Sequence, residues 1–182
     1  MKTIVLYNID KEIVDKYKEI EELKDVIFKR IDDTYLDVTV QDIFEKEDSL
    51  GDCSVYKRSY MIMEGVDKDY LSILNKAFKD NDLKFSGVKA MKTEYNKNWK
   101  LRDLFDEITE EDEIMSRVTT LRKLIMSTNN LDLSKYEESL SFGLKQALMN
   151  GYILINSKDL NIIKLDESIN NIKYFLNSIE EA

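Results

Sequence analysis

Two stretches of the sequence repeat the same order of predicted elements, and this repeat constrains the fold more than any other feature. Each begins with an apolar run suited to a strand, continues with an amphipathic helix and a second strand, and ends in a further helix. Val40–Phe44 and Leu101–Phe105 match in character at every position but the second, and Thr39 aligns with Lys100. Because the elements before them also come in the same order, duplication of one unit is the favoured interpretation.

The repeat predicts an α/β (α+β) fold for residues 1–110, built from two βαβ-type repeats over 1–47 and 58–110. Two such repeats supply four strands, which we expect to form one sheet layered with helices. The final helix of the first repeat is expected at about Val40–Lys46, and that of the second follows Lys100. A parallel sheet and an interleaved, ferredoxin-like sheet both remain open, because the pattern defines neither strand order nor strand direction.

The character of the sequence changes near residue 110, and the region 111–182 is predicted to be mostly helical. Apolar residues recur at helical spacing over 110–127 and 133–150 and again near the end of the chain. Gly151 stands where a helix C-cap is expected. Two short apolar runs then favour a short hairpin at 152–165. This order of elements is also that of a winged helix, but the balanced charge of the second helix argues against DNA binding.

Missing residue types exclude several classes of site. The sequence has no histidine, which excludes Ser-His-Asp and Cys-His catalytic sites and most transition-metal centres. Its five glycines are scattered, so neither a dinucleotide-binding loop nor a Walker A loop is present. The acidic run 106–113 lacks EF-hand spacing and is interpreted as a solvated helix face. We therefore predict no catalytic residues, no metal site and no cofactor.

Charge and cysteine content indicate the compartment and the class of partner. The chain has 27 basic and 36 acidic residues and a net charge of −9, which disfavours binding to nucleic acid or to an anionic membrane. Its single cysteine, Cys53, is typical of a reducing cytoplasm. The N-terminal apolar run is short and is interpreted as a strand rather than a signal peptide. We expect a cytoplasmic protein with no nucleic-acid partner and no membrane partner.

One polar loop concentrates residue types that bind ligands. It lies between the predicted strand 87–93 and the helix after it, and its candidate ligand-binding residues are Lys92, Tyr95, Asn96, Lys97, Asn98 and Trp99. Lysines supply positive charge, aromatic rings stack, and amides orient a ligand, a combination that suits a phosphorylated or nucleotide-like molecule. The same side chains also have a structural interpretation, as a helix cap, a turn residue and a core contact. Both interpretations remain open.

The stretch Lys89–Ile108 resembles a bacterial family catalogued as domain of unknown function 3783. The resemblance rests on the Asn-Lys-Asn-Trp segment at 96–99 and on the strand, acidic-capped helix and second strand before it, and it covers about residues 59–110. The family often has Thr after the Trp, where this chain has Lys100, which makes Asn98 the capping candidate. The resemblance implies a bacterial cytoplasmic protein, and it implies no established activity and no catalytic residues.

These observations favour a non-catalytic protein-interaction or regulatory module whose contact site is the Tyr95–Trp99 loop. The apolar C-terminal helices offer a further surface for a protein partner or for self-association as a homodimer. The alternative is a small-molecule or phosphorylated-ligand-binding protein that uses the same loop, with weak enzymatic activity from lysines or carboxylates. A third interpretation, motivated by the net charge of −9, is an acidic mimic of nucleic acid.

Overall fold

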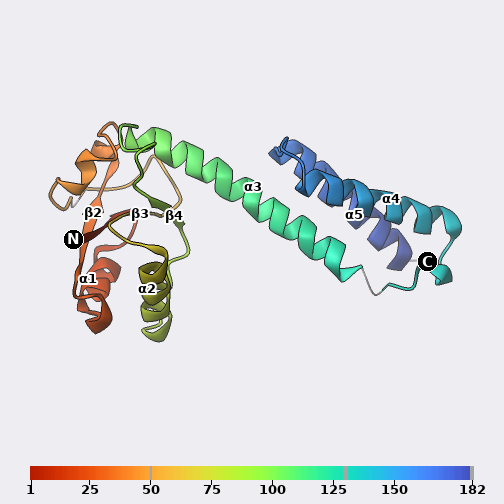
Figure 1. Cartoon of the computed structure of the whole chain (residues 1–182), viewed down its shortest axis with the longest axis horizontal. Coiled ribbons are helices and arrows are strands. Elements are labelled where there is room, and N and C mark those ends of the chain that lie inside the picture. Colours follow the sequence, from red (N-terminus) through yellow and green to blue (C-terminus); the bar gives the residue numbers. More distant parts are fainter. Residues whose placement is uncertain (50, 129–130, 181–182) are drawn as a thin grey trace. The chain divides into compact units, whose positions relative to one another are not determined.

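The computed structural model describes residues 1–49, 51–128 and 131–180 (Figure 1). The chain separates into two compact units, unit 1 (Met1–Thr109) and unit 2 (Glu110–Ala182). The sequence places its own division at nearly the same point, where the repeated pattern ends. Among the described residues, no helix is long and apolar enough to cross a membrane.

Unit 1 is an α/β structure built on a four-stranded mixed sheet, and the predicted fold class is confirmed. Its strands and helices are β1 (Lys2–Tyr7), α1 (Lys11–Glu19), β2 (Val26–Ile31), β3 (Tyr60–Glu64), α2 (Lys68–Asp80), β4 (Val88–Met91) and the beginning of α3 (Leu101–Ser127). Three short 3₁₀ segments lie between them: η1 (Glu21–Leu23), η2 (Asp33–Tyr35) and η3 (Asp42–Phe44).

The strand order is β2-β1-β3-β4. Strands β1 and β2 are parallel, β3 and β4 are parallel, and β1 and β3 are antiparallel neighbours in the centre. The two βαβ repeats therefore lie side by side, and the sheet is neither parallel throughout nor interleaved in the ferredoxin-like manner. The direction of β3 depends on the long connection 32–59, whose course no local pattern encodes.

Both faces of the sheet are covered, which explains why β1 is an almost continuous apolar run. Ile4 and Leu6 belong to the core that α1 and α2 cover. Val5 and Tyr7 belong to a second core, which η3 and the first turns of α3 cover. Figure 1 shows α1 and α2 together on one side of the strands and the start of α3 on the other. In the second core the rings of Tyr60 and Phe105 stack with centroids 3.9 Å apart.

The end of the first repeat pairs directly with the end of the second, and the pairing is symmetric. Thr39 forms an antiparallel bridge with Lys100, the residue with which the sequence aligns it. The Val40 amide donates to the Trp99 carbonyl (2.9 Å), and the Leu101 amide donates to the Val38 carbonyl (2.9 Å). These two bonds join equivalent residues in opposite directions, so the hydrogen-bond pattern has a local two-fold axis. The duplication itself stays a prediction.

The two repeats differ in how they end. The predicted helix at Val40–Lys46 is wrong, because only the single 3₁₀ turn η3 forms there. The Lys29 ammonium donates to the carbonyls of Phe44 (2.6 Å) and Lys46 (2.8 Å), so a side chain binds carbonyls at the point where a helix would continue. The second repeat instead continues into the 27-residue helix α3. This one helix continues across the division at Thr109, whereas the sequence predicts two separate helices there.

Unit 2 is helical, and the predicted hairpin at 152–165 is wrong. After α3 come η4 (Leu133–Lys135), α4 (Glu138–Ile155) and α5 (Ile162–Glu180), which together occupy most of the hairpin range. Gly151 is not a C-cap but an interior residue of α4. A Cβ atom at Gly151 would lie 3.2 Å from Leu121 Cδ1 and 3.3 Å from Ile172 Cδ1. The glycine therefore allows α4 to pack closely on two other helices.

Candidate functional site

The segment Thr93–Lys100, which we call the Tyr95 loop, joins β4 to α3 and takes its shape from Asn96. This side chain is 9% exposed. Its Oδ1 accepts from the Thr93 amide (2.8 Å), and its Nδ2 donates to the Met91 carbonyl (3.0 Å). The Asn96 carbonyl in turn accepts from the Trp99 amide (3.0 Å). The loop is therefore held in one conformation by its own residues and by the last residue of β4.

Residues 36–41 provide a second restraint on the Tyr95 loop. The Gln41 amide donates to the Lys97 carbonyl (2.9 Å), beside the symmetric bonds at Val40 and Leu101. Asp37 Oδ1 and Oδ2 accept from Lys100 Nζ (3.2 Å) and Arg102 Nη2 (2.7 Å), respectively. These hydrogen bonds, from Lys100 first and then Arg102, lower the pKa of Asp37. The backbone of the loop is thus fixed along most of its length.

Two aromatic side chains project from this fixed backbone. Tyr95 is 90% exposed, and Trp99, the only tryptophan in the sequence, is 39% exposed. Asn98 lies between them in the sequence and is also exposed. Of the six residues that the sequence singles out, these three lie at the surface.

The two lysines of the predicted site already have acidic partners. Lys92 forms an ion pair with Glu64, and its Nζ lies 5.6 Å from the centroid of the Phe44 ring. Lys97 Nζ lies 2.6 Å from Glu94 Oε2, and this hydrogen bond lowers the pKa of Glu94. A phosphorylated ligand that recruits either ammonium has to compete with a carboxylate from the chain itself.

The start of α3 differs from the predicted one. The helix begins at Leu101, so Lys100 occupies the position before it, and the Lys100 carbonyl accepts from the Leu104 amide (3.1 Å). Asn98 lies two residues further back and is not the cap. The structural role predicted for the asparagines belongs to Asn96, which closes the turn.

A polar cluster at the end of β2 was not predicted from the sequence. Asp32 is 4% exposed, and it accepts from the Thr34 amide (2.9 Å) and from the Ser49 hydroxyl. Asp33 accepts from the Tyr7 hydroxyl and from the amide (2.8 Å) and hydroxyl (2.7 Å) of Ser54. The signal in the sequence is the Asp-Asp-Thr triplet directly after an apolar strand, where buried carboxylates can bind a returning loop.

Burial and hydrogen bonds act in opposite directions on these carboxyl groups. Burial raises the pKa of Asp33, but hydrogen bonds from Tyr7 and Ser54 outweigh it, so the pKa lies below its ordinary value. The pKa of Asp32 is lowered in the same way, with Ser49 and Thr34 as donors. Burial, and then the hydrogen bond to Asp33, raises the pKa of the Tyr7 hydroxyl. The cluster therefore holds two ionised carboxylates that fasten the segment after η3 to the sheet.

Several cavities of the described residues lie away from the Tyr95 loop. One of about 610 Å³ is bordered by Glu138, Phe142 and Lys145 on α4. Another of about 540 Å³ lies between Lys16 on α1 and Asn81 after α2. Within the ranges that the structure describes, no group of three or more Cys, Asp or Glu side chains is arranged to hold a metal ion.

Comparison with known proteins identifies one family. Searches of curated proteins and of solved structures gave no match to the chain. Residues 59–115 match the family model described as Domain of unknown function (DUF3783). This range contains β3, α2, β4, the Tyr95 loop and the first turns of α3, that is, the second repeat. Over residues 59–115 the chain is thus similar to DUF3783, which confirms the predicted resemblance and assigns no activity.

Proposed function

We propose that this protein is a non-catalytic protein-interaction or regulatory module of the bacterial cytoplasm, and that the Tyr95 loop is its contact site. One observation carries the proposal: a loop whose conformation is fixed by Asn96 presents a tyrosine that is 90% exposed. Tyrosine and tryptophan are enriched among the residues that dominate protein–protein binding energies. A preformed loop also pays less conformational entropy on binding than a flexible one.

The contacts of the loop favour a protein partner over a small ligand. Both polar groups of the Asn96 side chain are bonded within the chain, so they are not free to orient a ligand. Lys92 and Lys97 each form an ion pair. Tyr95 and Trp99, by contrast, offer ring surface that a flat protein surface can cover without breaking these contacts.

The single cysteine supports the proposed compartment. Cys53 is a free, half-buried thiol, and its Sγ lies 3.5 Å from the Ile31 carbonyl oxygen. Burial raises the pKa of this thiol, which keeps it in the unreactive protonated form. A reduced, unpaired cysteine is typical of cytoplasmic proteins.

The test is site-specific photo-crosslinking in the bacterium of origin. A photoreactive phenylalanine analogue replaces Tyr95 in one variant and, as a matched control, the 64% exposed Tyr174 of α5 in another. We expect one discrete protein to be joined to the chain at position 95 and not at position 174. The same products at both positions, or none at position 95, would contradict the proposal.

Binding measurements with the purified partner complete the test. Tyr95→Ala is expected to weaken binding at least about 30-fold, since an interface hot spot contributes roughly 2 kcal/mol or more. Tyr174→Ala is expected to leave the affinity unchanged. Thermal shifts with nucleotides and inorganic phosphate test the alternative. A stabilisation that Lys92→Ala abolishes would favour the phosphorylated-ligand interpretation instead.

A further inference from the structure

Helix α4 carries large apolar residues on more than its buried side, which is unusual for a helix of a small helical unit. Between Ser141 and Ile155 the only charged residue is Lys145. A helix at the surface normally turns its apolar residues inward and its polar residues to solvent. Here only one side is buried: the inward face consists of Ser141, Leu144, Ala147 and Gly151.

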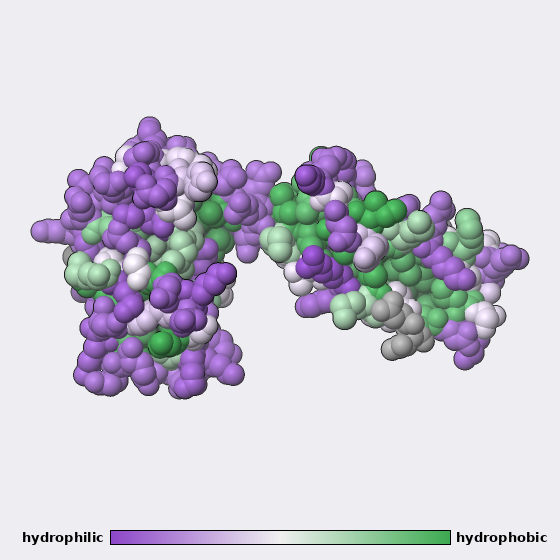
Figure 2. All heavy atoms as spheres, viewed as in Figure 1, coloured by the Kyte–Doolittle hydropathy of each residue, from purple (hydrophilic) through white to green (hydrophobic). Residues whose placement is uncertain are grey.

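The opposite side of α4 carries large apolar residues in contact with solvent. These are Phe142 (66% exposed), Met149 (66%), Tyr152 (61%) and Ile153 (55%). Their spacing puts them on one face, which we call the outer face of α4 and which also includes Lys145 and Gln146. Figure 2 shows hydrophobic side chains gathered over the region of α4 and α5.

The area of this face meets the requirement of a dimer. At about 200 Å² for each large side chain, the exposed fractions of the four apolar residues amount to roughly 500 Å² in one copy. Complete coverage of these side chains in two copies buries about 1,000 Å², which is at the lower limit for a specific interface. The flanking Lys145 and Gln146 side chains add to it.

The face can also pack against its own copy. In an antiparallel contact of two α4 helices centred on Met149, that residue meets its own copy, Lys145 lies opposite Ile153, and Gln146 lies opposite Tyr152. No like charges face each other, although the whole chain carries a net charge of −9. A two-fold interface requires a patch that can meet its own copy, and here the aliphatic stem of Lys145 can lie on Ile153 with its ammonium group in solvent.

We propose that the outer face of α4 is a homodimer interface, occupied by the same face of a second copy with Met149 at the two-fold axis. This interface is separate from the Tyr95 loop, so either proposal can fail without the other. It explains why four large apolar residues of α4 face solvent, since the second copy covers them.

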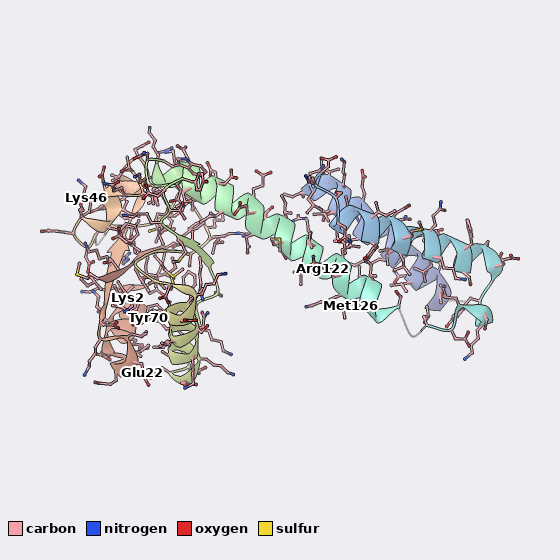
Figure 3. The ribbon with its side chains drawn as sticks, in the orientation of Figure 1. Lys2, Glu22, Lys46, Tyr70, Arg122 and Met126 are labelled. Atoms are coloured by element: carbon pink, nitrogen blue, oxygen red, sulfur yellow. The ribbon has the colours of Figure 1, made fainter. Side chains whose placement is uncertain are left out.

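The test compares two methionines of unit 2 in the full-length chain. Met149→Glu places two carboxylates at the axis, whereas Met126→Glu changes a 70% exposed methionine at the end of α3, labelled in Figure 3. Light scattering after size-exclusion chromatography should give a dimer for the wild type and for Met126→Glu, and a monomer for Met149→Glu. A monomeric wild type overturns the proposal, whether the face then packs within the chain or awaits another protein.

A crosslinking variant tests the interface independently of whether Met149→Glu folds. In a Cys53→Ser background, Met149→Cys puts two thiols at the axis, where mild oxidation is expected to form an intermolecular disulfide. Met126→Cys in the same background is the control and should stay monomeric on denaturing gels. Equal crosslinking of both variants, or none of Met149→Cys, contradicts an interface centred on Met149.

Discussion

At the scale of single residues, the same side-chain type plays opposite roles within one loop. Asn96 is buried and bonded through both polar groups, while Asn98, two residues later, is exposed. From the sequence both are equally good turn residues, caps or ligand contacts. Only the position of Thr93 and Met91 around Asn96 separates them.

Replacing Asn96 tests this distinction. Asn96→Ala leaves the Thr93 amide and the Met91 carbonyl without their partner, so the free energy of unfolding should fall by roughly 1–3 kcal/mol. Asn98→Ala, the control in the same loop, should change it by less than about 0.5 kcal/mol. Urea denaturation followed by Trp99 fluorescence measures both. Equal effects would show that the loop does not depend on Asn96.

The carboxylate Asp33 predicts a pH dependence of stability. Its pKa in the folded chain lies below the ordinary value, so the folded state binds fewer protons than the unfolded state in this range. Its contribution is therefore complete above the ordinary Asp pKa of about 3.9 and is lost as the pH falls through the folded value. Asp33→Asn should lower the free energy of unfolding near neutral pH. The further fall of this free energy on acidification should be smaller than in the wild type.

Urea denaturation at a series of pH values measures this effect. The exposed Asp52 provides the control, and Asp52→Asn should change the free energy of unfolding near neutral pH by less than about 0.5 kcal/mol. If the curves of wild type and Asp33→Asn run parallel through the acid range, the hydrogen bonds from Tyr7 and Ser54 do not stabilise the ionised form.

At the scale of elements, close approach between strands and helices depends on glycines. Gly87 precedes β4, and a Cβ atom there would lie 2.1 Å from the carbonyl oxygen of Ser59. That oxygen accepts from the Val88 amide (2.9 Å), the bond that starts the pairing of β4 with β3. The clash is with backbone, which cannot rotate away as a side chain can.

Gly87→Ala should consequently weaken the edge of the sheet. We expect a loss of roughly 1–3 kcal/mol in the free energy of unfolding, the usual cost of overpacking. Hydrogen exchange of the β4 amides should become faster in the same variant. Ser86→Ala, at the exposed neighbouring position, is the control and should be neutral. An unchanged exchange rate in Gly87→Ala would show that the strand ends can shift to admit a methyl group.

At the scale of the whole molecule, the two units have separate cores. Two clusters of unit 1 lie on the two faces of the sheet, and the third cluster contains only residues of α3 beyond the division, α4, α5 and the segments that join them. The only tryptophan, Trp99, belongs to unit 1. Its fluorescence therefore reports the unfolding of unit 1 separately from the total helix content.

A large side chain at Gly151 should unfold one unit and spare the other. Gly151→Leu forces a side chain into the contact with Leu121, Ser168 and Ile172, so the thermal transition of unit 2 should move to lower temperature. Circular dichroism at 222 nm should show this early loss of helix, whereas the Trp99 fluorescence transition should keep its midpoint. A common shift of both signals would mean that the units unfold together.

Much of the fold follows from local patterns in the sequence. Continuous apolar runs identified β1 and β3 because both strands are covered on two faces. The acidic cap that the family resemblance implies for the helix after β3 is Asp67, whose Oδ1 accepts from the Tyr70 amide (2.8 Å). The hairpin at 152–165 was wrong because Gly151 is a packing residue and not a helix end, a difference that only its contacts with other helices reveal.

The sequence by itself determined the α/β class, the repeated strand–helix–strand order and the residues at the surface loop after β4. These depend on side-chain periodicity and capping, which are properties of neighbouring residues. Only the tertiary structure decided that β1 and β3 are antiparallel, that Asn96 closes its loop and that the outer face of α4 is left exposed. Strand direction and the coverage of a helix depend on contacts between residues far apart in the chain. The role of Asn96 depends on the backbone turn that brings Thr93 and Met91 to its side chain, which residue types alone do not define.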